Sequence, residues 1–277
     1  MTNVENYQND IENLIKKRHV NGGDYWASED GRLNVGNPFS TITCSLILYE
    51  LGVDMSNPVL EGAANLVIGA CRKDGRFKLG PNGSLYPCYT VTPARLLCRL
   101  GYVGDTRLTK TFEYLLENQY GDGGWRCNKF PFGRGPETEY SNPGPTLQAL
   151  DAFRYTQYLN SDVRLDNAVE FLLRHWEIRK PIGPCHYGIG SLFKKIEFPF
   201  LQYNIFYYLY VLSFYNKAKK DPRFLSALNF LQSKLINDEI IVERANPKLK
   251  AYSFCEINKP NTLATNRYIE LMDNLLT

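Results

Sequence analysis

Apolar residues recur at helical spacing after four polar residues that are typical helix N-caps. These four residues are Asn57, Asp105, Asp162 and Asp221. Proline follows the first and the last of them, which suits the first position of a helix. Apolar residues stand three, seven and ten positions after each cap, on one face of an amphipathic helix. The pattern predicts a helix that begins at each cap.

A turn follows three of these helices in register. Seventeen residues after the caps stand Asp74, Asp122 and Asp238, and twenty residues after them stand Phe77, Trp125 and Ile241. The segments "DGRF", "DGGW" and "DEII" are therefore interpreted as copies of one element, with "DGRL" at 30–33 as a first copy, while the unit capped by Asp162 lacks it. In "DGGW", Gly123 and Gly124 are expected to allow a sharp reversal. Trp125 is then expected to pack between neighbouring units.

A second, more apolar helix is expected to close each unit. The candidates are "FSTITCSLILYELG", "TPARLLCRLG", "GPTLQALDAFR", the tyrosine-rich stretch after Pro199, and "TLATNRYIELMDNLL". We interpret Thr92-Pro93 and Gly144-Pro145 as matched helix starts, and Gly52 and Gly101 as matched stops. The sequence thus predicts an all-α fold of about five helical hairpins in one domain, residues 1–277. Aromatic-rich inner helices favour closure into a ring, and an open solenoid is the alternative with the same periodicity.

The composition points to a globular protein without a nucleic-acid partner. The 277 residues are 44% hydrophobic and carry a formal net charge of +3, so no basic excess calls for nucleic acid. Seven cysteines without a CxxC pair or a signal peptide predict reduced thiols in the cytoplasm. The apolar stretch 198–215 is interrupted by Pro199, Gln202, Asn204 and Ser213, which favours a buried helix over a transmembrane segment. Peripheral contact with a membrane stays open.

One stretch of the chain resembles a known repeat. "LLENQYGDGGWRCN" looks like the Gln-Trp repeat of the prenyltransferase and squalene-cyclase family. The stretch from "YPCYT" to "EFPFLQYNIFYYL" is similar to stand-alone bacterial and archaeal proteins with this repeat, and the similarity covers most of residues 58–215. The resemblance implies an α/α toroid with a central cavity. It also implies that Gln119 and Trp125 stack the turn against the next unit.

The catalytic signatures of that family are absent from the sequence. The chain contains no DxDD and no DDxxD motif, and no aspartate stands two residues before Cys88, Cys127 or Cys185, so the Asp-x-Cys zinc motif is missing too. Because a fold does not determine an activity, the resemblance implies a protein that binds or transforms an isoprenoid-like apolar substrate. A non-catalytic toroid scaffold that binds a protein or peptide is the alternative.

Aromatic residues of the predicted inner helices are the main candidates for binding. In the stretch 198–215, Tyr203, Phe206, Tyr207 and Tyr210 share one helical face. Such a wall would enclose an apolar ligand and could stabilise a carbocation, or its rings could instead pack between the two helical layers. The expected substrate-binding residues are Tyr86, Cys88, Tyr89, Arg126, Tyr140, Lys194, Phe200, Tyr203 and Tyr207.

Charged residues near these aromatics supply further candidates. The basic ones, for a diphosphate or carboxylate head group or as plain loop charges, are Arg126, Lys129, Arg134, Lys194 and Lys195. The carboxylates placed near inner helices are Glu137, Glu139, Asp151 and Glu197. One of them, if buried among aromatics, would be an acid with a raised pKa, and the sequence does not select it. His175 ends a helix, where a positive charge suits the helix dipole.

A zinc enzyme is the other alternative, with Cys127, Cys185 and His186 as ligands. Two thiolates and one imidazole would leave an open position for a water or a substrate thiol. The set resembles that of the lanthionine-forming cyclases, but there a glycine follows the histidine directly, whereas Tyr187 follows it here. Because no spaced ligand pair supports the site, we expect no metal or other cofactor and keep zinc as the alternative.

Overall fold

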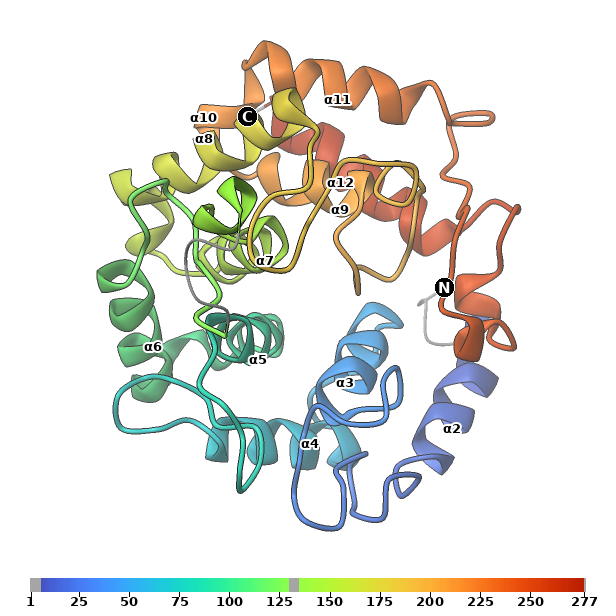
Figure 1. The fold of residues 1–277 in the computed structure, drawn as a ribbon. Coiled ribbons are helices and arrows are strands. Elements are labelled where there is room, and N and C mark those ends of the chain that lie inside the picture. Colours follow the sequence, from blue (N-terminus) through green and yellow to red (C-terminus); the bar gives the residue numbers. More distant parts are fainter. Residues whose placement is uncertain (1–5, 130–134, 277) are drawn as a thin grey trace. The chain divides into compact units, whose positions relative to one another are not determined.

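The computed structural model describes residues 6–129 and 135–276 (Figure 1). Apart from isolated β-bridges, the regular secondary structure in these ranges is helical. The chain forms two compact units. The first runs to Leu115 and includes Asn246–Cys255, and the second takes Leu116–Ala245 and the chain from Glu256 onward. The all-α prediction is therefore confirmed for these ranges. The predictions of a single domain and of five hairpins closed into a ring stay predictions.

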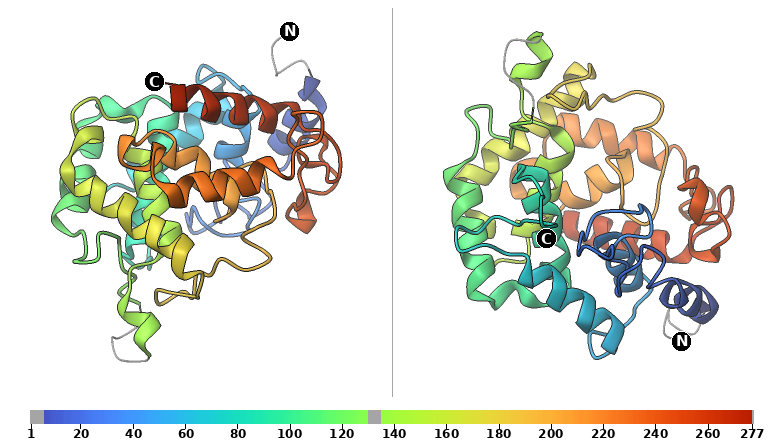
Figure 2. Two further views of the ribbon diagram at one scale, coloured as in Figure 1. Left: turned by 90° about the horizontal axis from the view of Figure 1, so that it is seen from above. Right: turned by 60° about the horizontal axis from the view of Figure 1, so that its bottom comes forward.

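The helices alternate between two layers within each unit. The α-helices in order are α2 (Gln8–Lys16), α3 (Thr41–Glu50), α4 (Pro58–Gly69), α5 (Pro87–Arg99), α6 (Thr106–Glu117), α7 (Pro143–Phe153), α8 (Val163–Ile178), α9 (Ile205–Leu212), α10 (Asn216–Lys219), α11 (Pro222–Gln232) and α12 (Thr262–Leu276). The short 3-10 helices are η1 (Tyr102–Gly104), η2 (Pro136–Glu139), η3 (Leu159–Ser161), η4 (Pro247–Leu249) and η5 (Ser253–Cys255). In the first unit α4 packs against both α3 and α5. In the second unit α9 lies between α7 and α12, and α8 and α11 pack over α7 and α9 (Figures 1 and 2).

All four predicted N-caps are confirmed. The side chains of Asn57, Asp162 and Asp221 each accept a hydrogen bond from the backbone N–H two residues later, and Asp105 accepts one from Arg107 at 2.8 Å. The apolar residues three, seven and ten positions after every cap are buried. The helical periodicity of the sequence therefore identifies the buried faces of α4, α6, α8 and α11.

The turn after an outer helix docks on the next inner helix through one repeated hydrogen bond. A buried backbone N–H donates to the hydroxyl of the threonine that is the fourth residue of that helix. The three copies join Phe77 to Thr90, Trp125 to Thr146 and Ile240 to Thr265, with N···O distances of 3.4, 3.1 and 3.0 Å. The prediction that Ile241 is equivalent to Phe77 and Trp125 is wrong by one position, because Ile240 makes the repeated hydrogen bond. In this copy Asp238 (φ +61°), and not the next residue, takes the left-handed place of the turn glycine.

Glycine is required in two of these turns because the turn touches the next outer helix. Gly75 and Gly123 have φ of +80° and +94°. A Cβ at either position would lie 2.3 Å from the carbonyl oxygen of Lys110 on α6 or 2.2 Å from that of Asn167 on α8. Lys110 and Asn167 each stand five residues after the cap of their helix. The two turns therefore pack against equivalent positions of successive outer helices, and only glycine fits there.

Gln119 and Trp125 occupy the positions that the resemblance implies. The Gln119 side-chain amide donates to the carbonyl oxygens of Gly123 (2.6 Å) and of Arg164 on α8 (2.8 Å). Trp125 is 1% exposed and stacks on Phe153 of α7, with ring centroids 6.2 Å apart. The two side chains thus join one turn to the following hairpin.

The predicted start of one inner helix is wrong. Helix α5 begins at Pro87, with extended Tyr86 before it, so Pro93 lies inside the helix and not at its start. Helix α7 begins at Pro143, two residues before the expected proline. The predicted stops are confirmed, because Gly52 and Gly101 both have φ of +84°.

Replacing Trp125 with alanine should lower the free energy of unfolding by about 3–5 kcal/mol, because it truncates a large buried side chain. Urea titration followed by circular dichroism measures the change. Tyr158, which is 89% exposed, is the matched aromatic control, and Tyr158→Ala should unfold with the wild-type midpoint. A Trp125→Ala midpoint equal to that of wild type would contradict the structural role.

Replacing Thr146 with valine keeps the shape of the side chain but leaves the buried Trp125 N–H without its acceptor. We expect a loss of about 1–3 kcal/mol, the cost of one buried unsatisfied donor. Thr109→Val on the exposed face of α6 is the control and should cost far less. Equal melting temperatures for the two variants would show that the repeated hydrogen bond does not stabilise the turn.

Candidate ligand-binding site

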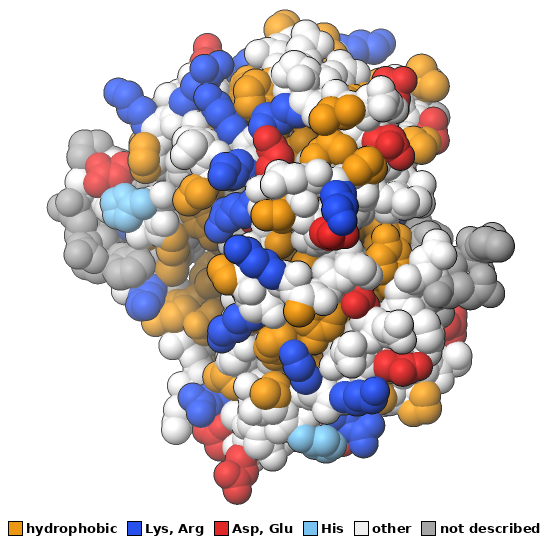
Figure 3. All heavy atoms as spheres, turned by 90° about the vertical axis from the view of Figure 1, so that its right-hand side faces the viewer, with side chains coloured by type: hydrophobic (Ala, Val, Ile, Leu, Met, Phe, Trp, Pro, Cys, Tyr) orange, Lys and Arg blue, Asp and Glu red, His pale blue; other side chains and the backbone are white. Residues whose placement is uncertain are grey.

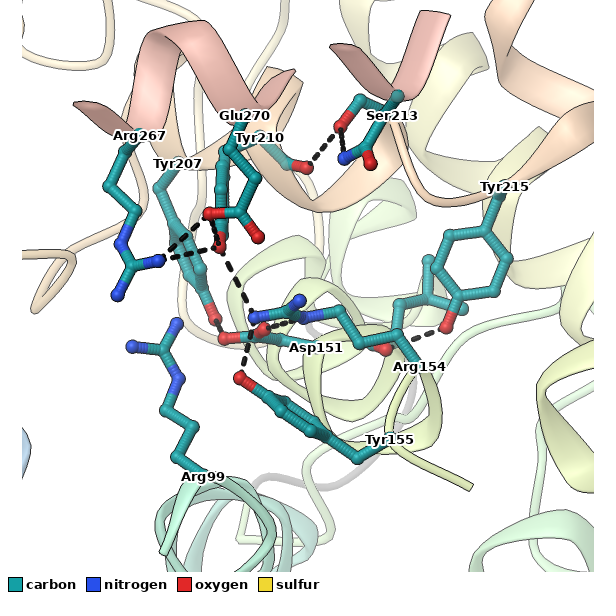
Figure 4. A network of polar contacts seen from close by, with 12 residues as sticks. Arg99, Asp151, Arg154, Tyr155, Tyr207, Tyr210, Ser213, Tyr215, Arg267 and Glu270 are labelled. Atoms are coloured by element: carbon teal, nitrogen blue, oxygen red, sulfur yellow. Dashed lines mark hydrogen bonds and ion pairs between the residues drawn. The ribbon is translucent and has the colours of Figure 1, made fainter. Parts of the chain in front are cut away.

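A buried ion pair joins two of the inner helices of the second unit. Asp151 on α7 is fully buried, and Arg154 one turn later donates from Nε to its Oδ1 at 2.7 Å. The hydroxyl of Tyr207 on α9 donates to Oδ2 of the same carboxylate at 2.9 Å (Figure 4). Both donors stabilise the charged form of the Asp151 carboxylate, which is the acceptor in both hydrogen bonds.

The Arg154 guanidinium lies among aromatic rings. Its central carbon is 4.1 Å from the ring centroid of Phe214, 4.3 Å from that of Tyr155 and 5.2 Å from that of Tyr210. It also donates to the hydroxyl of Tyr155 at 2.6 Å. These three rings therefore already lie against a cation of the protein.

Helix α12 contributes a second carboxylate and a second arginine. The Tyr210 hydroxyl donates to Glu270 at 2.9 Å, and Arg267 binds the same carboxylate at 2.8 Å (Figure 4). The network thus ties α7, α9 and α12 together through side chains that the sequence did not single out as a set. The spacing of Asp151 and Arg154 at i, i+3 in an otherwise apolar helix was the available signal.

The aromatic residues around α9 form two clusters on different sides of the helix. In the first, Phe200 stacks on Tyr207 with centroids 5.2 Å apart and contacts Phe206 and Tyr210 at 4.9 and 5.0 Å. Phe200 is 1% and Tyr207 2% exposed. Both predicted binding residues are therefore packed against other rings, with the Tyr207 hydroxyl engaged by Asp151.

The second cluster surrounds Tyr203, and the expected face of four aromatics is wrong at this residue. Helix α9 begins at Ile205 because Asn204 caps it, accepting hydrogen bonds from the N–H groups of Phe206 and Tyr207. Tyr203 precedes the cap and packs on Phe193 at 4.8 Å and on His175 of α8 at 5.8 Å. Burial, followed by the neighbouring phenols of Tyr208 and Tyr187, raises the pKa of Tyr203 well above its ordinary value.

His175 is a neutral hydrogen-bonding residue, and its expected role as a helix-end cation is wrong. The ring is fully buried. Its Nε2 lies 3.2 Å from the carbonyl oxygen of Lys180, which only accepts, so Nε2 carries the proton and Nδ1 accepts from the Tyr203 hydroxyl at 2.9 Å. Burial lowers the pKa of His175 to about 4, against the effect of backbone hydrogen bonds at Lys180 and Tyr187.

An open pocket of about 680 Å³ lies at the end of α8. Its wall is formed by Glu137, Tyr140, Ile178, Lys180, Pro181, Ile182 and His186. A smaller adjoining pocket shares Tyr140, Ile178 and Ile182 and reaches His175. The pocket therefore combines an apolar wall with the charged groups Lys180 and Glu137 and an imidazole. Tyr140 is the predicted binding residue that lines it.

The other predicted basic binding residues have structural contacts. Arg126 donates to the carbonyl oxygen of Thr138 at 3.0 and 3.2 Å and to that of Cys127 at 3.3 Å, so it holds its own loop. Lys194 lies over the ring of Phe230 on α11, 5.7 Å from the centroid. Arg134 lies outside the described residues.

The three candidates of the first unit lie at the start of α5. The rings of Tyr86 and Tyr89 are 5.5 Å apart, and Cys88, between them, is half-buried. Tyr89 lines a more polar pocket of about 450 Å³ together with Asp30, Arg32 and glycine-rich backbone at 79–84.

Burial raises the pKa of Glu197, one of the four candidate carboxylates, and nearby Arg244 opposes this effect. Glu197 is 4% exposed, and its carboxylate lies 3.4 Å from Arg244. Glu139 is exposed, and Glu137 lines the large pocket. The identity of the predicted acid stays open.

Asn142 joins the turn of Cys185 to the segment before Cys127, because its side chain accepts from the Cys185 N–H at 3.1 Å and its backbone N–H donates to the carbonyl oxygen of Trp125 at 3.1 Å. His186 lines the pocket. Within residues 6–129 and 135–276, no group of three His, Cys, Asp or Glu side chains is placed to hold a metal ion. Zinc at these residues stays an untested alternative.

Surface charge and helix length bear on the expected partners. Over the face shown in Figure 3, Lys and Arg side chains are interspersed with acidic and hydrophobic ones. No helix in the described part of the chain has the length and apolarity to cross a membrane. The absence of a nucleic-acid partner stays a prediction.

Comparison with known proteins finds matches among solved structures but not among sequences. No protein-family model matches the chain, and no curated protein matches its sequence. The apo structure of the type II terpene cyclase MstE from Scytonema aligns with 96% of this chain and 74% of that chain, at 13% identity and a TM-score of 0.46. A variant of MstE in complex with geranylgeranyl dihydroxybenzoate aligns with 96% and 73% of the two chains, at 14% identity and a TM-score of 0.46.

The burial of His175 predicts a pH-dependent stability. The folded pKa of about 4 lies below the ordinary 6.5, so the unfolded chain binds the proton more tightly. The stability from the neutral ring is complete above pH 6.5 and falls as the pH drops toward 4, by up to about 3 kcal/mol. The difference in unfolding free energy between wild type and His175→Gln should shrink by that amount from pH 7 to pH 4.

The exposed Val163 supplies the control for this measurement. Val163→Ala removes no ionisable group, and the side chain is 74% exposed, so this variant should keep the pH dependence of wild type. A parallel pH dependence for His175→Gln and wild type would contradict the assignment of a buried neutral imidazole.

Proposed function

We propose that this protein binds an isoprenoid-like apolar molecule with one polar end, in the pocket at the end of α8. The observation that supports this most is the wall of that pocket, where Tyr140, Ile178 and Ile182 present apolar surface and Lys180 supplies a cation. A volume of about 680 Å³ is in the range of small-molecule sites. The hydrocarbon would lie along the isoleucines and the polar end beside Lys180 and His186.

The isoprenoid character of the ligand rests on the Gln-Trp repeat. Gln119 and Trp125 make the inter-hairpin contacts that the resemblance implies. The proposal includes the closure of about five hairpins into a toroid, which is supported by the regular alternation of inner and outer helices within each unit.

The proposal is one of binding and not of proton-initiated cyclisation at Asp151. That carboxylate accepts hydrogen bonds from Arg154 and Tyr207, and both donors stabilise its charged form. The cation-stabilising rings beside it hold the Arg154 guanidinium. Catalysis by an acid would fall to Glu197, whose pKa is raised by burial.

The binding test uses 8-anilinonaphthalene-1-sulfonate, a fluorescent probe with an apolar body and an anionic end. Tyr140→Ala and Ile178→Ala, each at a residue that is 36% exposed, should weaken probe binding about 10-fold, which corresponds to the loss of about 1.4 kcal/mol of contact. Geranylgeraniol should displace the probe. Lipid extraction and mass spectrometry of the purified protein then identify any ligand retained from the cell.

Matched controls lie on the surface away from this pocket. Tyr158→Ala and Val163→Ala, at residues that are 89% and 74% exposed, should bind the probe as wild type does. Unchanged binding in the two pocket variants would rule out this pocket as the site. Displacement by a straight-chain alcohol as effective as that by geranylgeraniol would show that the ligand need not be isoprenoid.

A further inference from the structure

The first copy of the glycine turn, at residues 30–33, makes a different hydrogen bond from the later copies. Its buried Leu33 stands where Phe77 stands in the second copy, but the fourth residue of α3 is Cys44 and not threonine. The Leu33 N–H instead donates to the carbonyl oxygen of Leu79 at 2.9 Å. The turn is thereby joined to the segment that precedes α5, and both segments line a pocket of about 450 Å³.

Two glycines shape the wall of this pocket that residues 79–84 form. The Gly83 N–H donates to the carbonyl oxygen of Gly80 at 2.9 Å, which closes a tight turn. A Cβ at Gly80 would lie 2.6 Å from Cγ of Arg32, so a side chain at this position would displace the arginine. These contacts hold the wall in place, and the pocket is therefore formed before a ligand binds.

The two charged residues of the pocket neutralise each other. Arg32 donates from Nε to Oδ1 of Asp30 at 2.9 Å, and the Ser28 hydroxyl donates to the same oxygen. The hydrogen bonds from Ser28 and Arg32 lower the pKa of Asp30, so the carboxylate is charged at neutral pH and the pair has no net charge. The electrostatics of the pocket therefore favour a neutral ligand.

The uncharged polar side chains of the pocket are available to a ligand. Those of Asn34, Asn82, Ser84 and Tyr89 make no hydrogen bond to the part of the chain that the structure describes. Arg32 bonds to Asp30 through Nε, which leaves its two terminal amino groups as further donors. Amides and guanidinium groups offer neighbouring donors and acceptors that match adjacent hydroxyls. The pocket is therefore suited to a ligand with several hydroxyls.

One wall of the pocket is aromatic. Tyr89 lies in the first turn of α5, and its ring packs on that of Tyr86, with centroids 5.5 Å apart and planes inclined by 52°. The face of an aromatic ring is its negative side and attracts weakly positive C–H groups. A sugar ring satisfies both kinds of wall, because it presents C–H groups on a face and hydroxyls around its edge.

We propose that the pocket lined by residues of 30–35, of 79–84 and by Tyr89 binds a neutral pyranose. One C–H face of the sugar lies on the Tyr89 ring, and adjacent hydroxyls bind Arg32 and Asn82. All of these residues belong to the first unit, so the site does not depend on the function proposed for the pocket at the end of α8. A free sugar and the terminal sugar of a glycan present the same ring to the pocket.

The test is saturation-transfer difference NMR of the full-length protein with glucose, galactose, mannose and their methyl glycosides. At least one of these sugars should bind, with the largest signals from ring C–H protons that contact Tyr89. Tyr89→Ala should weaken binding about 10-fold, whereas Tyr89→Phe keeps the ring and should stay within about 3-fold of wild type. Asn82→Ala, which removes one hydrogen-bonding group, should weaken binding about 5-fold.

Tyr158→Ala and Asn160→Ala are the matched controls, because they change the same residue types at exposed positions outside this pocket. Both should bind the sugar as wild type does. The proposal is overturned if none of the sugars binds, if Tyr89→Ala binds as tightly as wild type, or if glycerol, which has hydroxyls but no ring, binds equally well.

A measurement on the wild-type protein keeps the test valid where a variant fails to fold. The bound sugar should shift the backbone amide resonances of Gly80 and Gly83, and resonances that do not move would place the sugar elsewhere and contradict the proposal. Binding of the free sugars alone would support the site as one for a free sugar. Binding of the methyl glycosides as well would support the end of a glycan.

Discussion

The structure depends on the hydrogen bond between a turn and the threonine one turn into the next inner helix. A buried backbone N–H needs an acceptor, and in three copies the threonine hydroxyl supplies it. The bond fixes the position along the inner helix at which each turn packs. It thereby places the aromatic or aliphatic residue of the turn in the core. In the unit capped by Asp162, the fourth residue of α9 is Tyr208, whose hydroxyl binds Leu172 on α8 instead. The unit that lacks the turn motif thus also lacks the threonine that would accept its hydrogen bond.

The two sides of α9 serve different purposes. Toward α8, Tyr203 and Tyr208 pack with His175 in a cluster in which the neutral imidazole is held by hydrogen bonds on both nitrogens. On the side toward α7 and α12, the hydroxyls of Tyr207 and Tyr210 donate hydrogen bonds to the carboxylates of Asp151 and Glu270. Helix α9 is apolar on nearly every face, and its polar side-chain groups are the hydroxyls of its tyrosines. The pocket that remains open lies beyond the end of α8, where the helix stops and the segment 180–186 folds back.

Local signals in the sequence predicted the helices well and long-range contacts poorly. Caps, helix stops and buried faces depend on residues within a few positions of one another, and Asn57 or Gly101 behave as their types suggest. Pro93 misled because Pro87 was an equally good start and only tertiary packing chooses between them. For the site, Tyr140 lines a pocket with an apolar wall, and Asn142 joins the turn of Cys185 to the segment before Cys127. The contact between Asp151 and Tyr207 joins two helices far apart in the chain, and the sequence gives no measure of which residues will face each other there.

The close contacts of Gly75 and Gly123 have a consequence for synthesis of the chain on the ribosome. Each glycine turn rests against the backbone of an outer helix that is translated later, Gly75 against Lys110 and Gly123 against Asn167. A hairpin that has just emerged therefore exposes its turn until the following helix has formed. Native packing of these two turns therefore waits for α6 and α8 to be synthesised.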